Sequence, residues 1–134
     1  MIAPNFLESH VSQIPAIQLL QQLGYSYLSP EEAAVERRGK LGGVLMENIL
    51  KTQLRRINRV VTKGREVPFT EEAINQAVEK LRSVPFDGLC RTSEAIFDLL
   101  TLGISVDQEV DGETKGRSLR FIDWEHQHNN SFHV

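Results

Sequence analysis

The sequence predicts an α+β fold in which a bundle of four to five helices precedes a β-hairpin. Apolar residues recur at helical spacing through most of the chain, most clearly between Ile74 and Leu81. From Ile104 the apolar spacing changes to two, as expected of a half-buried strand. The chain has 134 residues, so we expect residues 1–134 to form a single domain.

Two helices are predicted in the first part of the chain. Apolar residues at spacings of three and four favour a helix over residues 5–23, which Pro15 would kink or divide because proline removes a backbone donor. Residues 25–28 are short and aromatic and are typical of a strand. A second helix is predicted over residues 30–37, since Ser29 can cap the free backbone N–H groups.

Three further helices are predicted over residues 44–61, 71–82 and 89–102. The first would bury an apolar stripe made up of Leu50, Leu54, Ile57 and Val61. The second follows the capping sequence Thr70-Glu71-Glu72, and Pro85 separates it from the third.

The hairpin is predicted from strands at residues 104–110 and 117–124, joined by a turn at residues 111–116. Apolar side chains occupy both faces of the second strand, with Phe121 on one face and Trp124 on the other. A strand that is apolar on both faces is usually covered on both, and this chain offers little to cover it. Its last four residues are typical of the start of another strand. We therefore expect a truncated part of a larger sheet.

Composition excludes several classes of protein. The net charge is -3, so no overall basic excess marks a nucleic-acid binder. The single cysteine, Cys90, allows no internal disulfide, which fits a reducing cytoplasm, and we expect a small, half-buried side chain there. We find neither a signal peptide nor an apolar run long enough to span a bilayer, and expect a cytoplasmic protein without a membrane partner.

A local cluster of basic residues is the main candidate for nucleic-acid contact. Between residues 51 and 65 the chain has no acid and six bases, which are Lys51, Arg55, Arg56, Arg59, Lys63 and Arg65. Lys51, Arg55 and Arg59 are four apart and would line one helical stripe able to meet phosphates. Arg37, Arg38 and Lys40 could extend it. The alternative is an ordinary solvated face.

Two weaker candidates concern metal ions. His126, His128 and His133 lie close in sequence, but without a cysteine partner or carboxylates at ligand spacing we expect no metal site. Glu8 and Asp123 are carboxylates that could meet from a helix and a strand to hold Mg²⁺, although ion pairing is the commoner use of such groups. The chain has no P-loop, dinucleotide fingerprint or nucleophile–base pair.

Four segments follow one another in a distinctive order. They are Phe6-Leu7-Glu8 with Leu23-Gly24-Tyr25, Glu36-Arg37-Arg38 with Leu54-Arg55-Arg56-Ile57-Asn58, Thr70-Glu71-Glu72-Ala73-Ile74, and Phe121-Ile122-Asp123-Trp124 with Asn129-Asn130-Ser131-Phe132-His133-Val134. In this order and spacing they resemble the N-terminal region of the R subunits of type I restriction enzymes. The resemblance covers nearly the whole chain.

The resemblance implies a nuclease domain of the PD-(D/E)xK restriction-endonuclease-like fold, with helicase motor domains after it. The parent protein would cut DNA with Mg²⁺, move along DNA with ATP, and assemble with methylation and specificity subunits. In this family the cleavage Asp and the Glu-x-Lys pair follow an Asn-rich segment such as Asn129-Asn130. This sequence contains no Pro-Asp followed by Glu-x-Lys, so we expect the segment to be inactive and free of cofactors by itself. By position, Glu8 is the candidate for an accessory acid from the first helix.

The residues also leave a second reading open. The chain could be a stand-alone helical module that uses its basic helix to hold nucleic acid or an acidic protein surface. Salt-sensitive nucleic-acid binding by the chain alone, lost on charge reversal at Arg55 and Arg59, would indicate the former.

Overall fold

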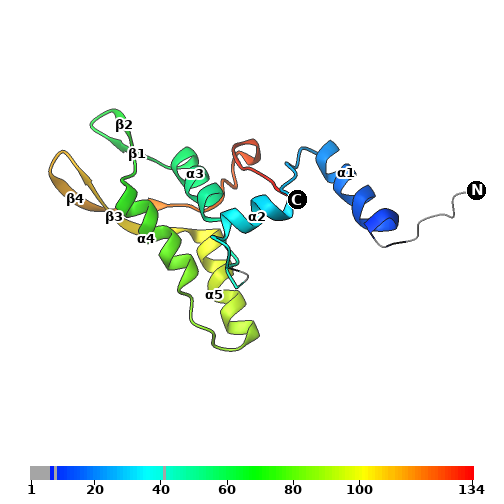
Figure 1. Ribbon diagram of the computed structural model, residues 1–134. Coiled ribbons are helices and arrows are strands. Elements are labelled where there is room, and N and C mark those ends of the chain that lie inside the picture. The colour runs from blue at the N-terminus through cyan, green and yellow to red at the C-terminus, as the bar shows by residue number, and fades with distance from the viewer. Residues whose placement is uncertain (1–6, 8, 41) are drawn as a thin grey trace, which may run out of the picture.

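The computed structural model describes residue 7, residues 9–40 and residues 42–134 (Figure 1). Over these residues the fold is α+β, as predicted, with five α-helices and two antiparallel hairpins. The helices are α1 (Ile14–Gln22), α2 (Pro30–Glu36), α3 (Glu47–Ile57), α4 (Glu71–Arg82) and α5 (Leu89–Leu102). The strands are β1 (Arg59–Thr62), β2 (Arg65–Pro68), β3 (Ile104–Val110) and β4 (Glu113–Leu119). A π-helical turn (Ser9–Gln13) precedes α1, and a 3-10 turn spans Gln127–Asn129.

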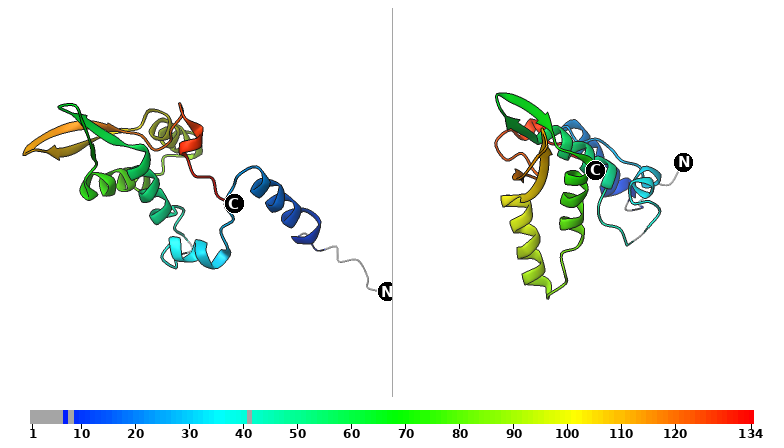
Figure 2. Two further views of the ribbon diagram at one scale, coloured as in Figure 1. Left: turned by 90° about the horizontal axis from the view of Figure 1, so that it is seen from above. Right: turned by 90° about the vertical axis from the view of Figure 1, so that its left-hand side faces the viewer.

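The predicted arrangement of a helical bundle leading into one sheet is not what these residues form. The strands make two separate two-stranded sheets, β1–β2 and β3–β4. α1 lies to one side of the other helices and buries none of its residues (Figures 1 and 2). α5 also buries no residue, whereas α3 packs against α4 and α4 packs against β3.

Three of the predicted helices agree closely with the structure. α4 and α5 have the predicted bounds, and α2 ends one residue earlier than expected. α2 begins with a capping box, in which the Ser29 hydroxyl accepts a hydrogen bond from the Glu32 amide and the Glu32 carboxylate accepts one from the Ser29 amide. The helix predicted over residues 5–23 changes from the π-helical turn to α1 at Ile14, next to Pro15, which lies in the first turn of α1. The predicted start of the first helix, at residue 5, lies outside the described residues.

The helix predicted over residues 44–61 is wrong at both ends. α3 begins at Glu47 and ends at Ile57, and the next residues form the β1–β2 hairpin. β-Branched side chains at residues 60–62 favour a strand, and the Lys63-Gly64 turn has φ angles of 48° and 73°, the left-handed pair typical of a two-residue hairpin turn. Val61, expected in the buried stripe, is 65% exposed.

The second strand of the C-terminal hairpin is also shifted from its predicted place. β4 spans Glu113–Leu119, and the turn is the two-residue Asp111-Gly112 in place of the expected six residues 111–116. Val110 pairs with Glu113 and Ile104 with Leu119. The chain leaves the strand after Leu119, so Phe121 and Trp124 do not lie on opposite faces of a strand.

The core lies between α3, α4 and the two hairpins. Its buried members include Leu54 of α3, Ile74 and Val78 of α4, Val106 of β3, and Phe121. α4 supplies four of the buried residues, at helical spacing, and it packs against both α3 and β3. The buried face of α4 therefore fixes the positions of these two elements.

The last residues of the chain pair with residues 26–28, which follow α1. The Ser26 amide donates to the Phe132 carbonyl oxygen at 2.8 Å, the Leu28 amide to the Val134 oxygen at 2.8 Å, and the Val134 amide to the Ser26 oxygen at 3.0 Å. These bonds form a short parallel bridge between two segments that the sequence marked as strand-like, residues 25–28 and 131–134. We call it the 26/133 bridge.

Candidate functional site

The six basic residues predicted to contact nucleic acid are spread over α3, β1, the hairpin turn and β2. Arg59 lies on β1, so the predicted helical stripe of Lys51, Arg55 and Arg59 does not exist. Arg55 forms a two-pronged ion pair with Glu71, with both N–O distances 2.8 Å. This pair raises the pKa of Arg55 and lowers the pKa of Glu71.

Two more basic residues are held by one acid at the tips of the hairpins. Asp111 accepts from Arg65 at 2.7 Å and lies 3.9 Å from the Lys63 ammonium. Arg56 and Arg59 remain exposed and form no ion pair with any residue that the structure describes. Of the cluster, these two guanidinium groups are the most available to an outside anion.

Arg37, Arg38 and Lys40, which were predicted to extend this cluster, do not form one free basic surface. Arg38 pairs with Glu47 at 3.3 Å, and Glu47 also pairs with Arg82 at the end of α4. Arg38 and Lys51 border one hollow of about 610 Å³, but Glu47 and Glu72 line it as well. This surface therefore carries both signs of charge. Arg37 and Lys40 form no ion pair within the described part of the chain.

Asp123 is the most tightly held carboxylate that the structure describes. It is 1% exposed, and it follows the bend after β4. Its Oδ1 accepts hydrogen bonds from the amides of Glu125 (3.2 Å) and His126 (3.0 Å), and its Oδ2 accepts one from the Asn129 side chain (2.9 Å). The Arg120 guanidinium lies 3.3 Å from each oxygen.

These donors favour the charged form of the carboxyl group. The Asn129 hydrogen bond is the largest cause that lowers the pKa of Asp123 below its usual range, followed by the His126 amide. The positive charge of Arg120 acts in the same direction, and desolvation opposes it. The carboxylate is therefore ionised at neutral pH, with its acceptor positions in use.

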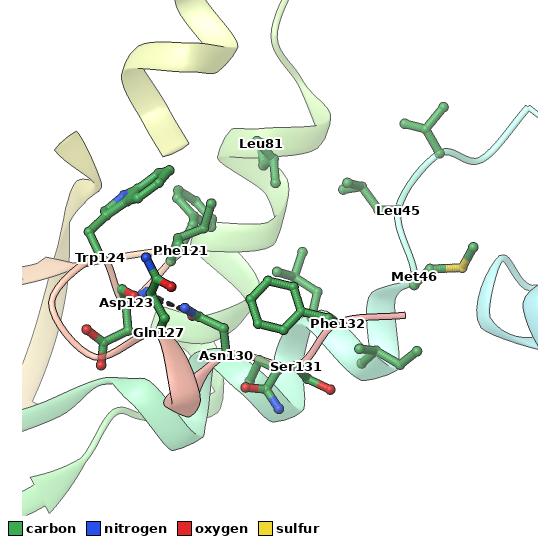
Figure 3. Close-up of a pocket in the computed structure, with 15 residues that line it drawn as sticks. Leu45, Met46, Leu81, Phe121, Asp123, Trp124, Gln127, Asn130, Ser131 and Phe132 are labelled. Carbon is green, nitrogen blue, oxygen red and sulfur yellow. Dashed lines mark hydrogen bonds between the residues drawn. The ribbon is translucent and has the colours of Figure 1, made fainter. Parts of the chain in front are cut away.

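Asn130 closes the same loop through the backbone. Its side-chain oxygen accepts from the Asp123 amide at 2.9 Å, and its side-chain nitrogen donates to the Asp123 carbonyl oxygen at 2.8 Å (Figure 3). On the other side, the Arg120 backbone is held by Asn58, which lies 62 residues earlier in the chain. We call residues 123–130, fixed in this way, the Asp123 loop.

An open apolar pocket of about 580 Å³ adjoins the Asp123 loop. Figure 3 shows Trp124 and Phe121 at one end of it and Leu45 and Met46 at the other, with Phe132 and Leu81 between them. Trp124 is 58% exposed, although its indole N–H donates to the Leu100 carbonyl oxygen at 3.0 Å. Much of the pocket wall therefore faces solvent.

The described residues do not assemble a metal site. No three of their His, Cys, Asp or Glu side chains lie close enough together to share a metal ion. His126 and His128 contact each other edge to face, and His133 belongs to the 26/133 bridge. Glu8, the predicted accessory acid, lies outside the described residues.

Sequence reasoning found Asp123 but not what it does. Asn58, Asn129 and Asn130 entered only through the family resemblance, and Arg120 was missed. The available signal was the spacing of Asp123 and Asn129-Asn130, since aspartate and asparagine side chains commonly bond nearby backbone groups in turns. Cys90, expected to be half-buried, is exposed. None of the described helices is long and apolar enough to cross a membrane.

Comparison with known proteins gives two matches. Residues 5–134 match the family described as "Type I restriction enzyme R protein N terminus". The chain is 28% identical over 129 residues to the "Type I restriction enzyme HindI endonuclease subunit" of Haemophilus influenzae, and the match covers 93% of this chain and 11% of that protein. No solved structure matches.

Proposed function

The chain belongs to the family of type I restriction enzyme R protein N-termini, and from this membership we propose that it opens the DNA-cleaving domain of a much longer R subunit. The chain spans 11% of the length of the Haemophilus subunit that it resembles. The whole R subunit would move along DNA with ATP, cut unmethylated DNA with Mg²⁺, and assemble with methylation and specificity subunits.

The structural observation that supports this proposal is the 26/133 bridge. Parallel strands are stable mainly inside larger sheets that are covered on both faces. A bridge of three hydrogen bonds has neither further strands beside it nor much cover on its faces. Further strands of the R subunit would extend the bridge into the sheet of a restriction-endonuclease-like domain.

The apolar pocket supports the same proposal. It borders the bridge through Phe132, and a second apolar hollow borders it through Leu28 and Val134. The Gln53 side-chain oxygen, at the wall of the larger pocket, is buried with no hydrogen-bond donor among the described residues. Buried acceptors are nearly always paired, so a donor from the remaining polypeptide would complete this wall.

Magnesium does not fit the residues described here. Mg²⁺ is bound through free carboxylate oxygens, and the Asp123 oxygens are occupied by N–H donors and Arg120. We therefore assign no step of DNA cleavage to this chain, and the metal-holding carboxylates would come from the polypeptide after it.

Reconstitution tests the proposal directly. The full-length R subunit, combined with methylation and specificity subunits, is expected to cut unmethylated DNA only with ATP and Mg²⁺, and the 134-residue chain is expected to cut none. Cleavage by the chain alone, or an R subunit whose assembled complex never cuts, would contradict the proposal. The alternative of a stand-alone binding module has no observation in its favour.

DNA contact by Arg56 and Arg59 is a second, narrower proposal. Both guanidinium groups are exposed, and both are free of the ion pairs that hold Arg55, Lys63 and Arg65. The Arg56→Glu/Arg59→Glu variant is expected to weaken DNA binding by the R subunit about tenfold or more at low salt. Arg55→Glu/Arg65→Glu, which breaks two internal ion pairs with the same change in net charge, is the matched control and should have a smaller effect. Unchanged DNA affinity, with weaker binding to the other subunits, would indicate a protein-docking role instead.

A further inference from the structure

The Asp123 loop joins the end of the β3–β4 hairpin to the 26/133 bridge. Arg120, whose backbone is fixed by the buried Asn58, lies three residues before the loop. The chain leaves the loop at Asn130, two residues before Phe132, the first residue that pairs with Ser26. Its exit direction therefore depends on how residues 123–130 are closed.

The closure is centred on one carboxylate. The Asp123 carboxylate accepts hydrogen bonds from two backbone amides, from the Asn129 side chain and from Arg120. The Asn130 side chain forms hydrogen bonds with both the amide and the carbonyl oxygen of Asp123. Hydrogen bonds to a charged acceptor are stronger than those between neutral groups. Without the carboxylate, the Asn129 side chain and two amides would lose their shared acceptor.

We propose that Asp123 is a positioning residue, whose carboxylate closes residues 123–130 so that Phe132 and Val134 pair with Ser26 and Leu28. The proposal rests on the proposed function in one respect: the bridge then sets the path by which the polypeptide enters the remaining nuclease sheet. The positioning itself concerns only residues of this chain.

Both the charge and the shape of the carboxylate matter in this role. Arg120 and His126, whose Nδ1 lies 3.9 Å from Oδ1, are the charged or titratable groups that the structure places against it. An asparagine at position 123 keeps one acceptor oxygen but turns an NH₂ group toward the Asn129 NH₂ group or Arg120. A charge-swapped pair, asparagine at 123 with aspartate at 129, would restore a donor facing an acceptor.

Amide hydrogen exchange measures the positioning. In the full-length protein that contains this chain, Asp123→Asn is expected to lower the protection of the Ser26, Leu28 and Val134 amides about tenfold or more, while the amides of α4 keep theirs. Asn129→Ala removes one donor and should give a smaller loss at the same three amides. The double variant Asp123→Asn/Asn129→Asp should recover protection. Asp107→Asn, the same change on an exposed β3 residue, is the control.

Unchanged protection of these three amides in Asp123→Asn would overturn the proposal, and so would a loss without recovery in the double variant. If Asp123→Asn unfolds the chain, Asn129→Ala and the double variant decide. In the full-length R subunit, Asp123→Asn should reduce DNA cleavage with ATP hydrolysis retained. If the exchange results hold but the wild-type subunit cleaves no DNA, the proposed function fails and the positioning role stands.

Discussion

At the scale of single residues, the buried side chain of Asn58 links the end of α3 to the residue after β4. Its NH₂ group donates to the Leu54 and Arg120 carbonyl oxygens, and its oxygen accepts from the Arg120 amide. The amide and the carbonyl oxygen of Arg120, a half-buried residue, are thus both hydrogen-bonded. Asn58 holds the chain just before it enters the Asp123 loop.

Replacing this side chain should be costly. Asn58→Ala leaves the Arg120 amide and carbonyl without partners, and we expect a loss of about 2–3 kcal/mol in the free energy of unfolding. Urea denaturation followed by circular dichroism measures it. Asn75→Ala, on the exposed side of α4, should change stability by less than about 0.5 kcal/mol. Equal effects of the two substitutions would contradict the role of Asn58.

The lowered pKa of Asp123 predicts a dependence of stability on pH. The ordinary pKa of this carboxyl group is 3.8. At pH values just below 3.8, Asp123 is mostly protonated in the unfolded chain but still mostly ionised in the folded chain, because its pKa there is lower. The contribution of Asp123 is therefore complete above about pH 4 and is lost as the pH falls through the lowered pKa of the folded state. The stability difference between wild type and Asp123→Asn should be constant from pH 5 to 7 and shrink toward pH 2. A difference that grows on acidification would show the wrong sign.

At the scale of elements, two glycines with the same φ angle should differ in what they tolerate. Gly64 and Gly103 both have φ of 73°. A Cβ on Gly64 would meet nothing within 4 Å, whereas a Cβ on Gly103 would lie 2.4 Å from the Leu119 carbonyl oxygen. The first glycine serves the β1–β2 turn, and the second brings the end of α5 close to β4.

Alanine substitutions compare the two positions. Gly64→Ala is expected to cost about 1–2 kcal/mol, for the left-handed conformation alone. Gly103→Ala should cost about 1–3 kcal/mol more, because φ of 73° with ψ of -163° suits only glycine and the added Cβ would also clash with the Leu119 backbone. Thermal unfolding of the two variants gives the comparison. Similar losses would mean that the approach of Gly103 to β4 is relaxed in solution.

The elements that sequence predicted well have strong local signals. The α4 pattern of four buried apolar residues agrees with its capping threonine, and β3 alternates buried and exposed residues as its sequence suggests. Both hairpin turns were misjudged, each for its own reason. Lys63-Gly64 and Asp111-Gly112 are two-residue turns, and the helical spacing before the first and the polar residues around the second concealed them.

The candidate site was less predictable because its contacts are distant in sequence. Asp123 could be marked as a carboxylate of interest, but its hold on Arg120 depends on Asn58, which lies on another element. The basic cluster was predicted to form one helical stripe because the sequence shows the spacing of the basic residues but not the acids that pair with them. The acids that neutralise half of it, Glu71 and Asp111, come from other parts of the chain.

At the scale of the whole molecule, the open apolar pocket should bind an apolar fluorescent dye in the 134-residue chain. Trp124, the single tryptophan, borders the pocket, so bound dye should quench its emission by energy transfer. Phe132→Ser is expected to weaken dye binding severalfold, because it removes apolar surface from the wall. Phe97→Ser, on the exposed face of α5, is the control. Equal dye binding by both variants would place the dye elsewhere.

The central claim is that the rest of an R subunit covers this pocket and extends the 26/133 bridge. Oxidative footprinting with mass spectrometry, comparing the 134-residue chain with the full-length subunit, tests it most directly. We predict that the reactivity of Trp124, Phe132 and Met46 falls severalfold in the full-length protein. Equal reactivity in both would contradict the account, because the pocket would then face solvent in the complete subunit as well.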